Sequence, residues 1–576
     1  MRSRPLLDTA LPVTALAVAL AVALAVVLVA AGAVTAGAVP PDPTDAPEQR
    51  IDASEQRIDA PEYTDVDTGH DSASPPRIVE LYPNPTAEGN RGEYLIVRLP
   101  EPGNWSLADG YHEASLPAEA TGEVALSMAP NRTRAHVGDD VALRALDDHF
   151  PLSASGDRIE LRRDGEPVDV VEYGRVREGY RWRADWDEWR PDGYDPRRPA
   201  RVDGATVTPF VLPDSPDVPI EPLRSAEHRI LIAGYTVESE RVADALVDAA
   251  ERGVTVEVLV EGSPVGGFSE RGAAVADRLE SAGVEVRVLD GDPNRFRFHH
   301  AKYAVADDRA VVLTENWKAE GTGGRSSRGW GVAAADPRLA DELAALFEND
   351  ATAADARPWR RFREDAEFHR SGSANATYPE RFDPPEPERA DVELLTAPGN
   401  AEDRIVQRID AADDRVLAVV PRTDGPDGRI VRALRRAGDR GVDVHLLLSG
   451  AWYDAEENRR LSRALDEEPI EATVADPRGR FEKVHAKGLV IDDTVVVGSL
   501  NWNEAAATNN REVLVAIESP SVAAFYARAY AADWRGGGRR LPIGLLAGLS
   551  LAIVGGGVAA RREVSFVRSG GSARER

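Results

Sequence analysis

Two stretches of the chain share one pattern of polar residues, and they decide the fold. The first reads His300-Ala-Lys302-Tyr-Ala-Val-Ala-Asp307, the second reads His485-Ala-Lys487-Gly-Leu-Val-Ile-Asp492, and they align without a gap. In each, a further Asp and then an apolar run follow, as in a β-hairpin whose turn is the Asp-Asp pair. Residues two apart on a strand face the same way, so the His and the Lys of each motif are expected to project together.

The likeness continues past both hairpins. Thr314-Glu-Asn316-Trp317 follows the first, and Ser499-Leu-Asn501-Trp502 follows the second. Lysine is rare elsewhere, since Lys318 and Lys483 are the only other lysines in the sequence. Two matches to His-x-Lys-x4-Asp, at equivalent places in a repeat, are therefore not a chance occurrence.

The repeat extends upstream of the motifs. In each copy an apolar strand precedes an amphipathic helix, and the helix ends at Arg-Gly-Val before another strand. The apolar residues spaced three or four apart are Val242, Leu246 and Ala249 in the first helix and Ile430, Leu434 and Ala437 in the second. Gly253 and Gly441 suit the left-handed position past a helix end. This order predicts two α/β/α halves, residues 221–352 and 391–534, joined by a linker over 353–390.

The residue types predict phosphodiester chemistry. A phosphodiester is negatively charged, so its cleavage needs cations and hydrogen-bond donors around phosphorus, a nucleophile and a proton source. Lys302 and Lys487 supply the charge, and two imidazoles that titrate near neutrality divide the remaining work. The expected phosphate-binding donors are Asn316, Asn501, Ser499 and Thr314. The sequence has no metal-ligand spacing such as His-Glu-x-x-His, so no metal and no cofactor is expected.

On these motifs the chain resembles the phospholipase D superfamily, from about Ile220 to Trp534. The resemblance implies two halves packed face to face about a pseudo-twofold, with both motifs lining one cleft. It also implies that one His attacks phosphorus to form a phosphohistidine, while the other protonates the leaving alcohol. We take His300 as the nucleophile and His485 as the acid, and the near-symmetry of the motifs leaves the order open.

Each His should also be oriented by a carboxylate through its other ring nitrogen. The second copy offers Glu512, where the family usually has such a residue, but the matching stretch of the first copy, Arg328-Gly329-Trp330, has no acid. The first copy further replaces the usual Gly-Ser with Leu313-Thr314. These departures bear on whether the two halves are equivalent. Asp307 and Asp492 are expected either to act in catalysis or to stabilise the turns, and the sequence leaves both alternatives open.

Residues 76–175 show short apolar stretches broken by Gly, Pro and Asn, which predicts an all-β sandwich. Within it, Asp157–Leu161 and Val168–Val171 flank Arg163-Asp-Gly165, as in a hairpin. The Glu-Leu-Tyr-Pro-Asn-Pro opening and the Trp105-Ser-Leu-Ala-Asp-Gly110 turn resemble the lamin-tail family of immunoglobulin-like domains, which favours a binding or spacer role. Residues 176–220 are interpreted as an irregular connection.

Both ends of the chain are apolar. Residues 1–40 open with Arg2 and Arg4 and continue as an Ala/Val/Leu run, which predicts a signal peptide or a first membrane segment. Residues 541–560 are uncharged and long enough for a transmembrane helix, and the basic tail 561–576 is expected to stay in the cytoplasm. The Pro-rich acidic stretch 41–75 is typical of a disordered spacer. The catalytic part is therefore expected to be extracytoplasmic and held at the cell membrane by the C-terminal helix.

The composition limits stabilising devices and partners. The chain has 576 residues, no cysteine and a formal net charge of −29, so disulfides and thiolate metal sites are excluded. The acid excess is spread along the chain, which is typical of a solvating surface. With lysine so rare, the composition resembles that of halophilic proteins adapted to multimolar salt.

Three functions remain open on the sequence alone. The leading one is hydrolysis or transfer of phospholipid head groups, because a membrane helix would hold the site next to lipid. The first alternative is an extracytoplasmic nuclease, since the superfamily also contains enzymes that cut DNA or RNA; the acidic surface opposes nucleic acid in dilute buffer, but multimolar salt screens that charge. The second is a non-catalytic surface protein that binds phosphate-bearing polymers. No protein partner is predicted.

Overall fold

The computed structural model describes most of the chain between the two apolar ends. The described residues are 62–64, 75–86, 91–134, 136–137, 141–186, 188–194, 199–291, 294–372, 374, 376–465, 468–475 and 480–535. The expected N-terminal segment (1–40), most of the acidic spacer (41–75), the C-terminal apolar helix (541–560) and the basic tail (561–576) lie outside them. Within the described part, no helix combines the length and apolar character needed to cross a membrane.

The N-terminal region consists of two sheets around one core. The five-stranded sheet has the order β1-β9-β8-β4-β5 and the six-stranded sheet the order β11-β10-β2-β3-β6-β7. Apolar side chains from both, such as Leu95 and Leu161, are buried in the same cluster. The expected strand-rich region is thus confirmed, while the immunoglobulin-like and lamin-tail assignments stay predictions. The elements are β1 Glu62–Thr64, β2 Arg77–Asn84, β3 Tyr94–Leu99, β4 Trp105–Ala108, β5 Glu113–Ser115, β6 Gly122–Ser127, α2 Pro130–Thr133, β7 Ala142–Ala145, β8 Asp157–Arg163, β9 Glu166–Tyr173, β10 Tyr180–Arg183 and β11 Arg190–Pro191.

The hairpin expected at Arg163-Asp-Gly165 is present. β8 and β9 pair antiparallel on either side of Asp164 and Gly165, whose φ angles are 53° and 87°. Two successive positive φ angles are typical of a type I′ turn, which Asp and Gly adopt with little strain.

The interpretation of residues 176–220 as an irregular connection is wrong. They contain β10, β11 and the 13-residue strand β12, Ala200–Leu212. β12 pairs antiparallel with β18 (Ser327–Ala335) on one side and with β20 (Glu388–Ala397) on the other. Thr206, Val207 and Thr208 favour a strand, but Gly204 and Pro209 interrupt the pattern, and the pairing partners of β12 are distant in sequence.

One 16-stranded sheet carries both halves of the repeat. Its order is β19-β15-β14-β13-β16-β17-β18-β12-β20-β27-β26-β25-β21-β22-β23, and β24 pairs with β18. The first half contains α3 Glu221–Ser225, β13 Arg229–Gly234, α4 Glu240–Glu251, β14 Thr255–Glu261, α5 Glu270–Ser281, β15 Glu285–Leu289, β16 Tyr303–Ala306, β17 Arg309–Leu313, β18 and α6 Pro337–Ala351. β19 Ala356–Pro358 and α7 Trp359–Asp365 follow, so part of the expected linker is structured. The second half contains β20, α8 Ala401–Asp410, β21 Arg415–Val420, α9 Arg429–Asp439, β22 Asp443–Leu448, α10 Ala455–Ala464, β23 Glu471–Val474, β24 Lys483–Val484, β25 Gly488–Ile491, β26 Thr494–Gly498, α11 Glu504–Thr508, β27 Glu512–Glu518 and α12 Pro520–Trp534.

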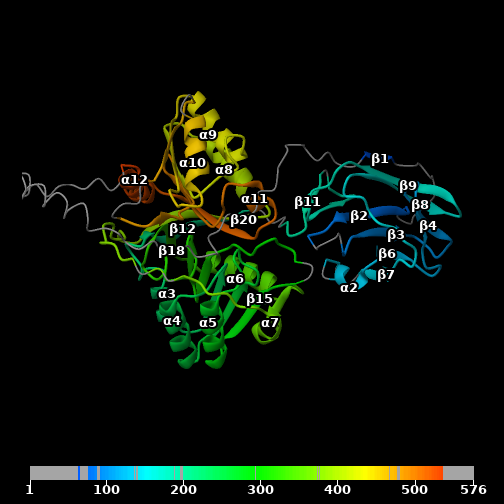
Figure 1. Cartoon of the computed structure of the whole chain (residues 1–576), viewed down its shortest axis with the longest axis horizontal. Coiled ribbons are helices and arrows are strands. Elements are labelled where there is room, and N and C mark those ends of the chain that lie inside the picture. The colour runs from blue at the N-terminus through cyan, green and yellow to red at the C-terminus, as the bar shows by residue number, and fades with distance from the viewer. Residues whose placement is uncertain are drawn as a thin grey trace, which may run out of the picture.

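The two halves repeat one strand pattern. β13, β14 and β15 are parallel neighbours, while β16, β17 and β18 continue antiparallel from β13. β21, β22 and β23, with β25, β26 and β27, do the same in the second half. The expected α/β halves, both hairpins and the amphipathic helices α4 and α9 are therefore present. Figure 1 shows α4 and α5 of the first half and α8, α9 and α10 of the second half on opposite outer sides of the joined strands, with the strand-rich region beside both halves.

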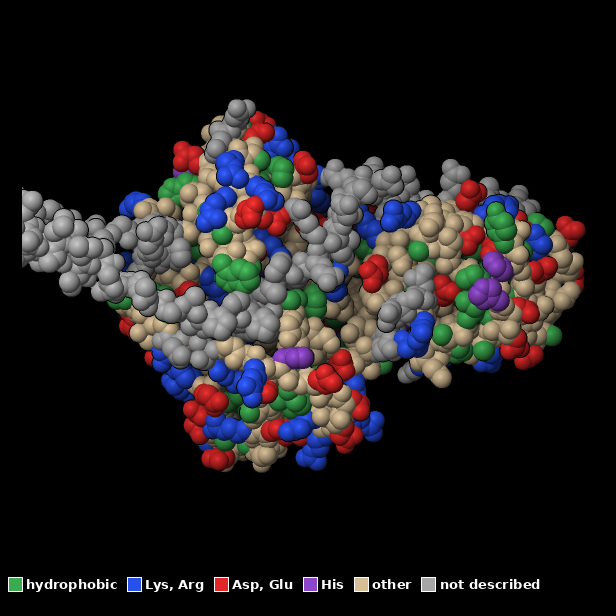
Figure 2. All heavy atoms as spheres, viewed as in Figure 1, with side chains coloured by type: hydrophobic (Ala, Val, Ile, Leu, Met, Phe, Trp, Pro, Cys, Tyr) green, Lys and Arg blue, Asp and Glu red, His purple; other side chains and the backbone are tan. Residues whose placement is uncertain are grey.

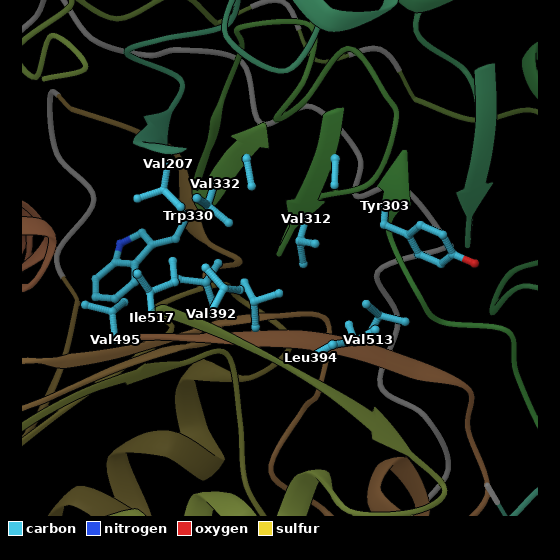
Figure 3. Packing of buried hydrophobic residues seen from close by; sticks show 14 of the residues in the cluster. Val207, Tyr303, Val312, Trp330, Val332, Val392, Leu394, Val495, Val513 and Ile517 are labelled. Atoms are coloured by element: carbon cyan, nitrogen blue, oxygen red, sulfur yellow. The ribbon is translucent and has the colours of Figure 1, made fainter. Parts of the chain in front are cut away.

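The core between the halves is apolar and shared. Figure 3 shows Val312 and Trp330 from the first half facing Val392 and Ile517 from the second. Trp330 is nearly fully buried and stacks on Tyr526, with ring centroids 4.6 Å apart. Close packing of this kind holds the two halves in one relative orientation. The residues at the joined edges of the halves are therefore held in place as well.

Charges of both signs are interspersed on the surface. On the face shown in Figure 2, acidic and basic side chains are interspersed over the two α/β halves and the strand-rich region. Many form surface ion pairs, such as Arg278 with Asp244 and Arg436 with Asp410. Exposed pairs of this kind stabilise a fold by only about 0–1 kcal/mol each.

Candidate active site

The two motifs meet where the halves join. His300 and Lys302 lie immediately before β16, and His485 and Lys487 lie between β24 and β25. The His300 N–H donates to the carbonyl of Arg511 in the second half at 2.9 Å, and the His485 N–H donates to the carbonyl of Arg328 in the first half at 2.9 Å. Each histidine backbone is thus tied to the opposite half, and the two motifs form one site.

Glu512 orients a histidine, but not the one in its own half. Its two carboxylate oxygens lie 2.9 and 3.0 Å from His300 Nδ1. The sequence-based expectation associated Glu512 with the second copy, so this part of the prediction is corrected. The residue was identified and its partner was not, because the partner depends on how the halves pack.

Glu315 is the acid that sequence reasoning missed. Its Oε2 lies 3.2 Å from His485 Nδ1, and its Oε1 accepts a 2.6 Å hydrogen bond from Ser327 Oγ. Among the described residues, His485 Nδ1 makes no contact that meets full hydrogen-bond geometry, so this pair is looser than the first. The available signal was an acid in Thr314-Glu-Asn316 where the second copy has Leu500.

Burial shifts the titration of all these groups. It raises the pKa of Glu315 and of Glu512 to about 7, against the opposing effect of nearby lysines. Burial, followed by the positive charges of Lys487, Lys302 and Lys483, holds the pKa of His485 well below its usual value. A neutral imidazole is therefore favoured at position 485 in the unliganded site.

Both lysines are buried beside the histidines. Lys302 Nζ donates to the His300 carbonyl, and Lys487 Nζ donates to the His485 carbonyl at 2.8 Å. The Lys302 ammonium also lies 5.2 Å from the ring centroid of Tyr235, which meets the His300 ring edge-on at 4.9 Å. The sequence did not single out Tyr235, and Pro421 follows the equivalent strand of the second half, so the surroundings of the two histidines differ.

The four predicted phosphate donors fall into two kinds. Asn316 and Asn501 are buried, and within the described part of the chain their Oδ1 atoms accept no hydrogen bond. Thr314 Oγ1 instead accepts from the Trp330 N–H at 2.9 Å, and Ser499 Oγ accepts from the Val513 N–H at 3.0 Å. Both hydroxyls therefore hold the next strand in place, and their phosphate-binding role stays a prediction.

Asp307 and Asp492 stabilise the turns. Asp307 accepts the N–H groups of residues 227, 228 and 229 at 2.7–2.9 Å, and Asp492 accepts those of residues 413, 414 and 415 at 2.9–3.0 Å. Burial alone would raise their pKa, but these donors outweigh it and lower the pKa of both. Both residues have positive φ, 52° and 49°. Of the two alternatives left open by the sequence, the geometry favours the turn.

Known proteins are similar to this chain over both halves of the repeat. The family model described as "Cardiolipin synthase, PLD-like domain" matches residues 220–351 and 405–534. Cardiolipin synthase B of Salmonella typhi and that of Escherichia coli K12 are each 29% identical over 309 residues, covering 51% of this chain and 71% of theirs. Phosphatidylserine synthase of Haemophilus influenzae is a similar solved structure, at 14% identity and a TM-score of 0.44, covering 57% of this chain and 87% of its own.

The chain belongs to the phospholipase D superfamily.

Behind this phospholipase D-like site lies a mirrored set of buried ion pairs. Arg511 is held by Asp350 of α6, at 2.9 and 3.1 Å. Arg328 is held by Asp533 of α12 at 2.9 Å and by Asp214 at 2.6 Å. Each arginine is the residue whose carbonyl accepts the main-chain N–H of a motif histidine in the other half, so these pairs fix the backbone of the site.

His299, next to His300, belongs to this supporting layer of the phospholipase D-like site. Its Nε2 lies 3.6 Å from Asp350, and its N–H donates to the buried Glu261 at 2.6 Å. In the part of the chain that the structure describes, the acidic and His side chains form no group of three that could hold a metal ion.

Proposed function

We propose that the protein transfers or hydrolyses phospholipid head groups through a phosphohistidine. The observation that carries the proposal is the pairing of two histidine–glutamate dyads, whose glutamates are both buried, with two buried lysines in one site. The match to a cardiolipin synthase family model over both halves supports lipid as the substrate class.

In the first step, His300 Nε2 attacks phosphorus. A P–N bond forms, the P–O bond to the leaving alcohol breaks, and His485, which takes up a proton from solvent once the substrate's negative charge is bound, gives that proton to the alcohol. Glu512 supports the nucleophile, because a carboxylate on Nδ1 favours the tautomer with a free electron pair on Nε2. Lys302, Lys487 and the amides of Asn316 and Asn501 hold the non-bridging oxygens.

In the second step, water or an acceptor alcohol attacks the phosphohistidine. His485 removes the proton of the attacking hydroxyl, the new P–O bond forms and the P–N bond to His300 breaks. Both imidazoles then return to their starting protonation states, so the cycle balances in atoms and charge. Water as acceptor gives hydrolysis, and an alcohol gives head-group transfer.

We further propose the setting in which this chemistry occurs. An extracytoplasmic enzyme anchored by residues 541–560 has lipid head groups within reach. The low lysine content and net charge of −29 suit function in concentrated salt. The strand-rich region would bind or space the enzyme at the cell surface, as the lamin-tail resemblance implies.

In the test, the full-length protein is incubated in high salt and a chelator with two substrates, labelled phosphatidylglycerol vesicles and a labelled oligonucleotide. The variants are His300→Ala and His485→Ala, and the matched control is His149→Ala, which removes an exposed imidazole from the strand-rich region. We expect release or transfer of the head group by wild type and control, and loss of this activity in both site variants. Cleavage of the oligonucleotide alone would indicate a nuclease in place of a lipid enzyme. If neither substrate is cleaved, a non-catalytic binding protein is favoured.

The phosphohistidine has its own readout. Rapid quenching of the reaction with ³²P-labelled substrate in an alkaline denaturant should trap label on the protein at a single position, because the P–N bond of phosphohistidine survives alkali and is hydrolysed in acid. Peptide mapping should locate it at His300; label at His485 would reverse the two roles, and an unlabelled enzyme that turns over would contradict the covalent step.

A further inference from the structure

The first half lacks an acid where the second half has Glu512. The main-chain hydrogen bonds align the two strand starts: Thr314 N–H donates to the Trp330 carbonyl at 3.0 Å, and Ser499 N–H donates to the Val513 carbonyl at 3.0 Å. Trp330 and Val513 are therefore equivalent, and the residues before them, Gly329 and Glu512, are equivalent too. The first half thus has no side chain at the position from which the second half reaches across to a histidine.

The side chain of Glu315 fills the space that Gly329 leaves. A Cβ placed on Gly329 would lie 2.1 Å from Glu315 Cγ, and a Cβ on Gly321 would lie 2.7 Å from Glu315 Cβ. Contacts this short cannot occur, so both glycines are required by the path of the Glu315 side chain. At the equivalent of position 315, the second half has Leu500, which is fully buried.

Each of the two carboxylates also accepts a hydrogen bond from a side chain, and the two donors stand at equivalent positions of the repeat. Ser327 Oγ donates to Glu315 Oε1 at 2.6 Å, and its counterpart Asn510 donates through Nδ2 to Glu512 Oε1 at 3.3 Å. The flanking residues are equivalent as well, since Arg328 and Arg511 each present a carbonyl to a histidine N–H of the other half. The two carboxylates therefore occupy matching surroundings while coming from different positions in the repeat.

We propose that Glu315 is the positioning residue of His485 and replaces the acid absent from position 329. The inference rests on the proposed function, because His485 is taken as the group that carries the proton. Held by Glu315 on Nδ1, the ring presents Nε2 to the leaving oxygen in the correct tautomer. The 3.2 Å contact of the unliganded site shortens when His485 becomes protonated, since both partners then carry charge.

The experiment relocates the acid within the full-length protein. Glu315→Gln keeps the shape and the Ser327 contact but removes the charge, and Glu315→Leu removes both. The double variant Glu315→Leu/Gly329→Glu rebuilds in the first half the arrangement seen in the second. The chromogenic substrate is bis(p-nitrophenyl) phosphate, which tests cleavage of a phosphodiester without assuming a lipid.

We expect Glu315→Gln and Glu315→Leu to lower kcat by about 10²- to 10⁴-fold, the range of a general acid–base contribution, with KM nearly unchanged. The double variant should regain at least tenfold over Glu315→Leu. Unchanged kcat in Glu315→Gln, while His485→Ala is inactive, would overturn the inference and leave the proposed function intact. Circular dichroism and melting curves identify any variant that fails to fold.

A second measurement is independent of turnover. The ¹⁵N shifts of the His485 ring report which nitrogen carries the proton, and the signal is assigned by its loss in His485→Ala. We expect the Nδ1–H tautomer in wild type and in the double variant, and a shift toward the Nε2–H tautomer in Glu315→Gln. If the wild-type protein cleaves no phosphodiester, the proposed function fails, and this spectrum alone decides whether Glu315 positions His485. The same tautomer in all variants would contradict that role of Glu315.

Discussion

Burial, and after it the positive charges of Lys487, Lys302 and Lys483, disfavour the protonated form of His485. In the unliganded site they hold its pKa well below the usual value, which leaves the ring without the proton that the proposed first step requires. In the proposed mechanism, a bound phosphodiester would bring a negative charge beside Lys302 and Lys487 and cancel part of their effect on this pKa. Substrate binding would therefore load the acid, and the site would be protonated only when it is occupied.

This coupling predicts a measurable rise in the pKa of His485. Dimethyl phosphate, an inert phosphodiester, should raise it by about 1 or more, because an opposite charge at 4–6 Å shifts a pKa by about 1–3. The measurement is an NMR titration of the ring with and without the ligand, at moderate salt so that screening does not hide the effect. An unchanged pKa at saturating ligand would show that the lysines do not mediate the coupling.

The sequence predicted the histidines, lysines and asparagines because each repeats at the same place in two aligned copies. It could not predict the partners of the histidines. Glu512 contacts His300 and Glu315 contacts His485 only through the packing of one half on the other, which no spacing within a copy encodes. Glu315 was harder to predict than Glu512, because its position in the first half has no acidic counterpart in the second. The structural role of Asp307 could be separated from a catalytic one only by the main-chain N–H groups that donate to it.

At the level of elements, the last helix of each half holds the other half in place. α6 supplies Asp350 to Arg511, and α12 supplies Asp533 to Arg328. Burial would raise the pKa of Asp350, but Arg511 and the other positive groups around it outweigh burial and lower its pKa far below the usual value. Each helix thus acts on the strand that carries a histidine anchor in the opposite half.

Asp350→Asn should therefore destabilise the fold strongly. Removing one partner of a buried ion pair leaves the other uncompensated, which costs about 3–5 kcal/mol. The measurement is urea unfolding, with Glu456→Gln as control, because its surface pair with Arg460 contributes at most about 1 kcal/mol. The folded-state pKa of Asp350 lies below its unfolded value, so its contribution is present above about pH 4 and is lost as pH falls. A loss below 1 kcal/mol at pH 7 would contradict the proposed importance of the pair.

Periodicity made some elements predictable and left others hidden. α4 and α9 follow from apolar residues that repeat along one face, and the left-handed Gly253 and Gly441 end them as expected, each at φ 92°. In β12 the alternation of buried residues is interrupted by Gly204 and Pro209. β12 is a strand because β18 and β20 flank it, and those partners lie more than a hundred residues away in sequence.

For the whole molecule, the strand-rich region and the catalytic halves are in contact close to the site. Thr86 Oγ1 donates to the Asn294 carbonyl at 2.9 Å, and Arg177 pairs with Glu504. Gly193 lies so near Phe296 that a Cβ there would approach the ring to 2.1 Å. Phe296 in turn lies under the Arg511 guanidinium, 4.4 Å from it, so the contact reaches the residue that anchors His300.

Gly193→Ala should lower activity without unfolding either region. The new methyl group displaces Phe296 and, through it, Arg511, and misplacing catalytic groups by about 1 Å can cost up to about 10²-fold. The control is Gly174→Ala in the same region, where a Cβ meets no atom within 4 Å. Steady-state kinetics and melting curves are the measurements, and equal activity of the two variants would show that the strand-rich region is not coupled to the site.

The continuous sheet has a consequence for how the chain can be divided. β12 and β20 pair at the centre, and the apolar core of Figure 3 draws on both halves. The covalent connection between the halves is therefore not what holds them together. If a protease cut the chain between α7 and β20, the two fragments would stay associated as one active enzyme. The same two fragments, made as separate polypeptides, would assemble into the same structure.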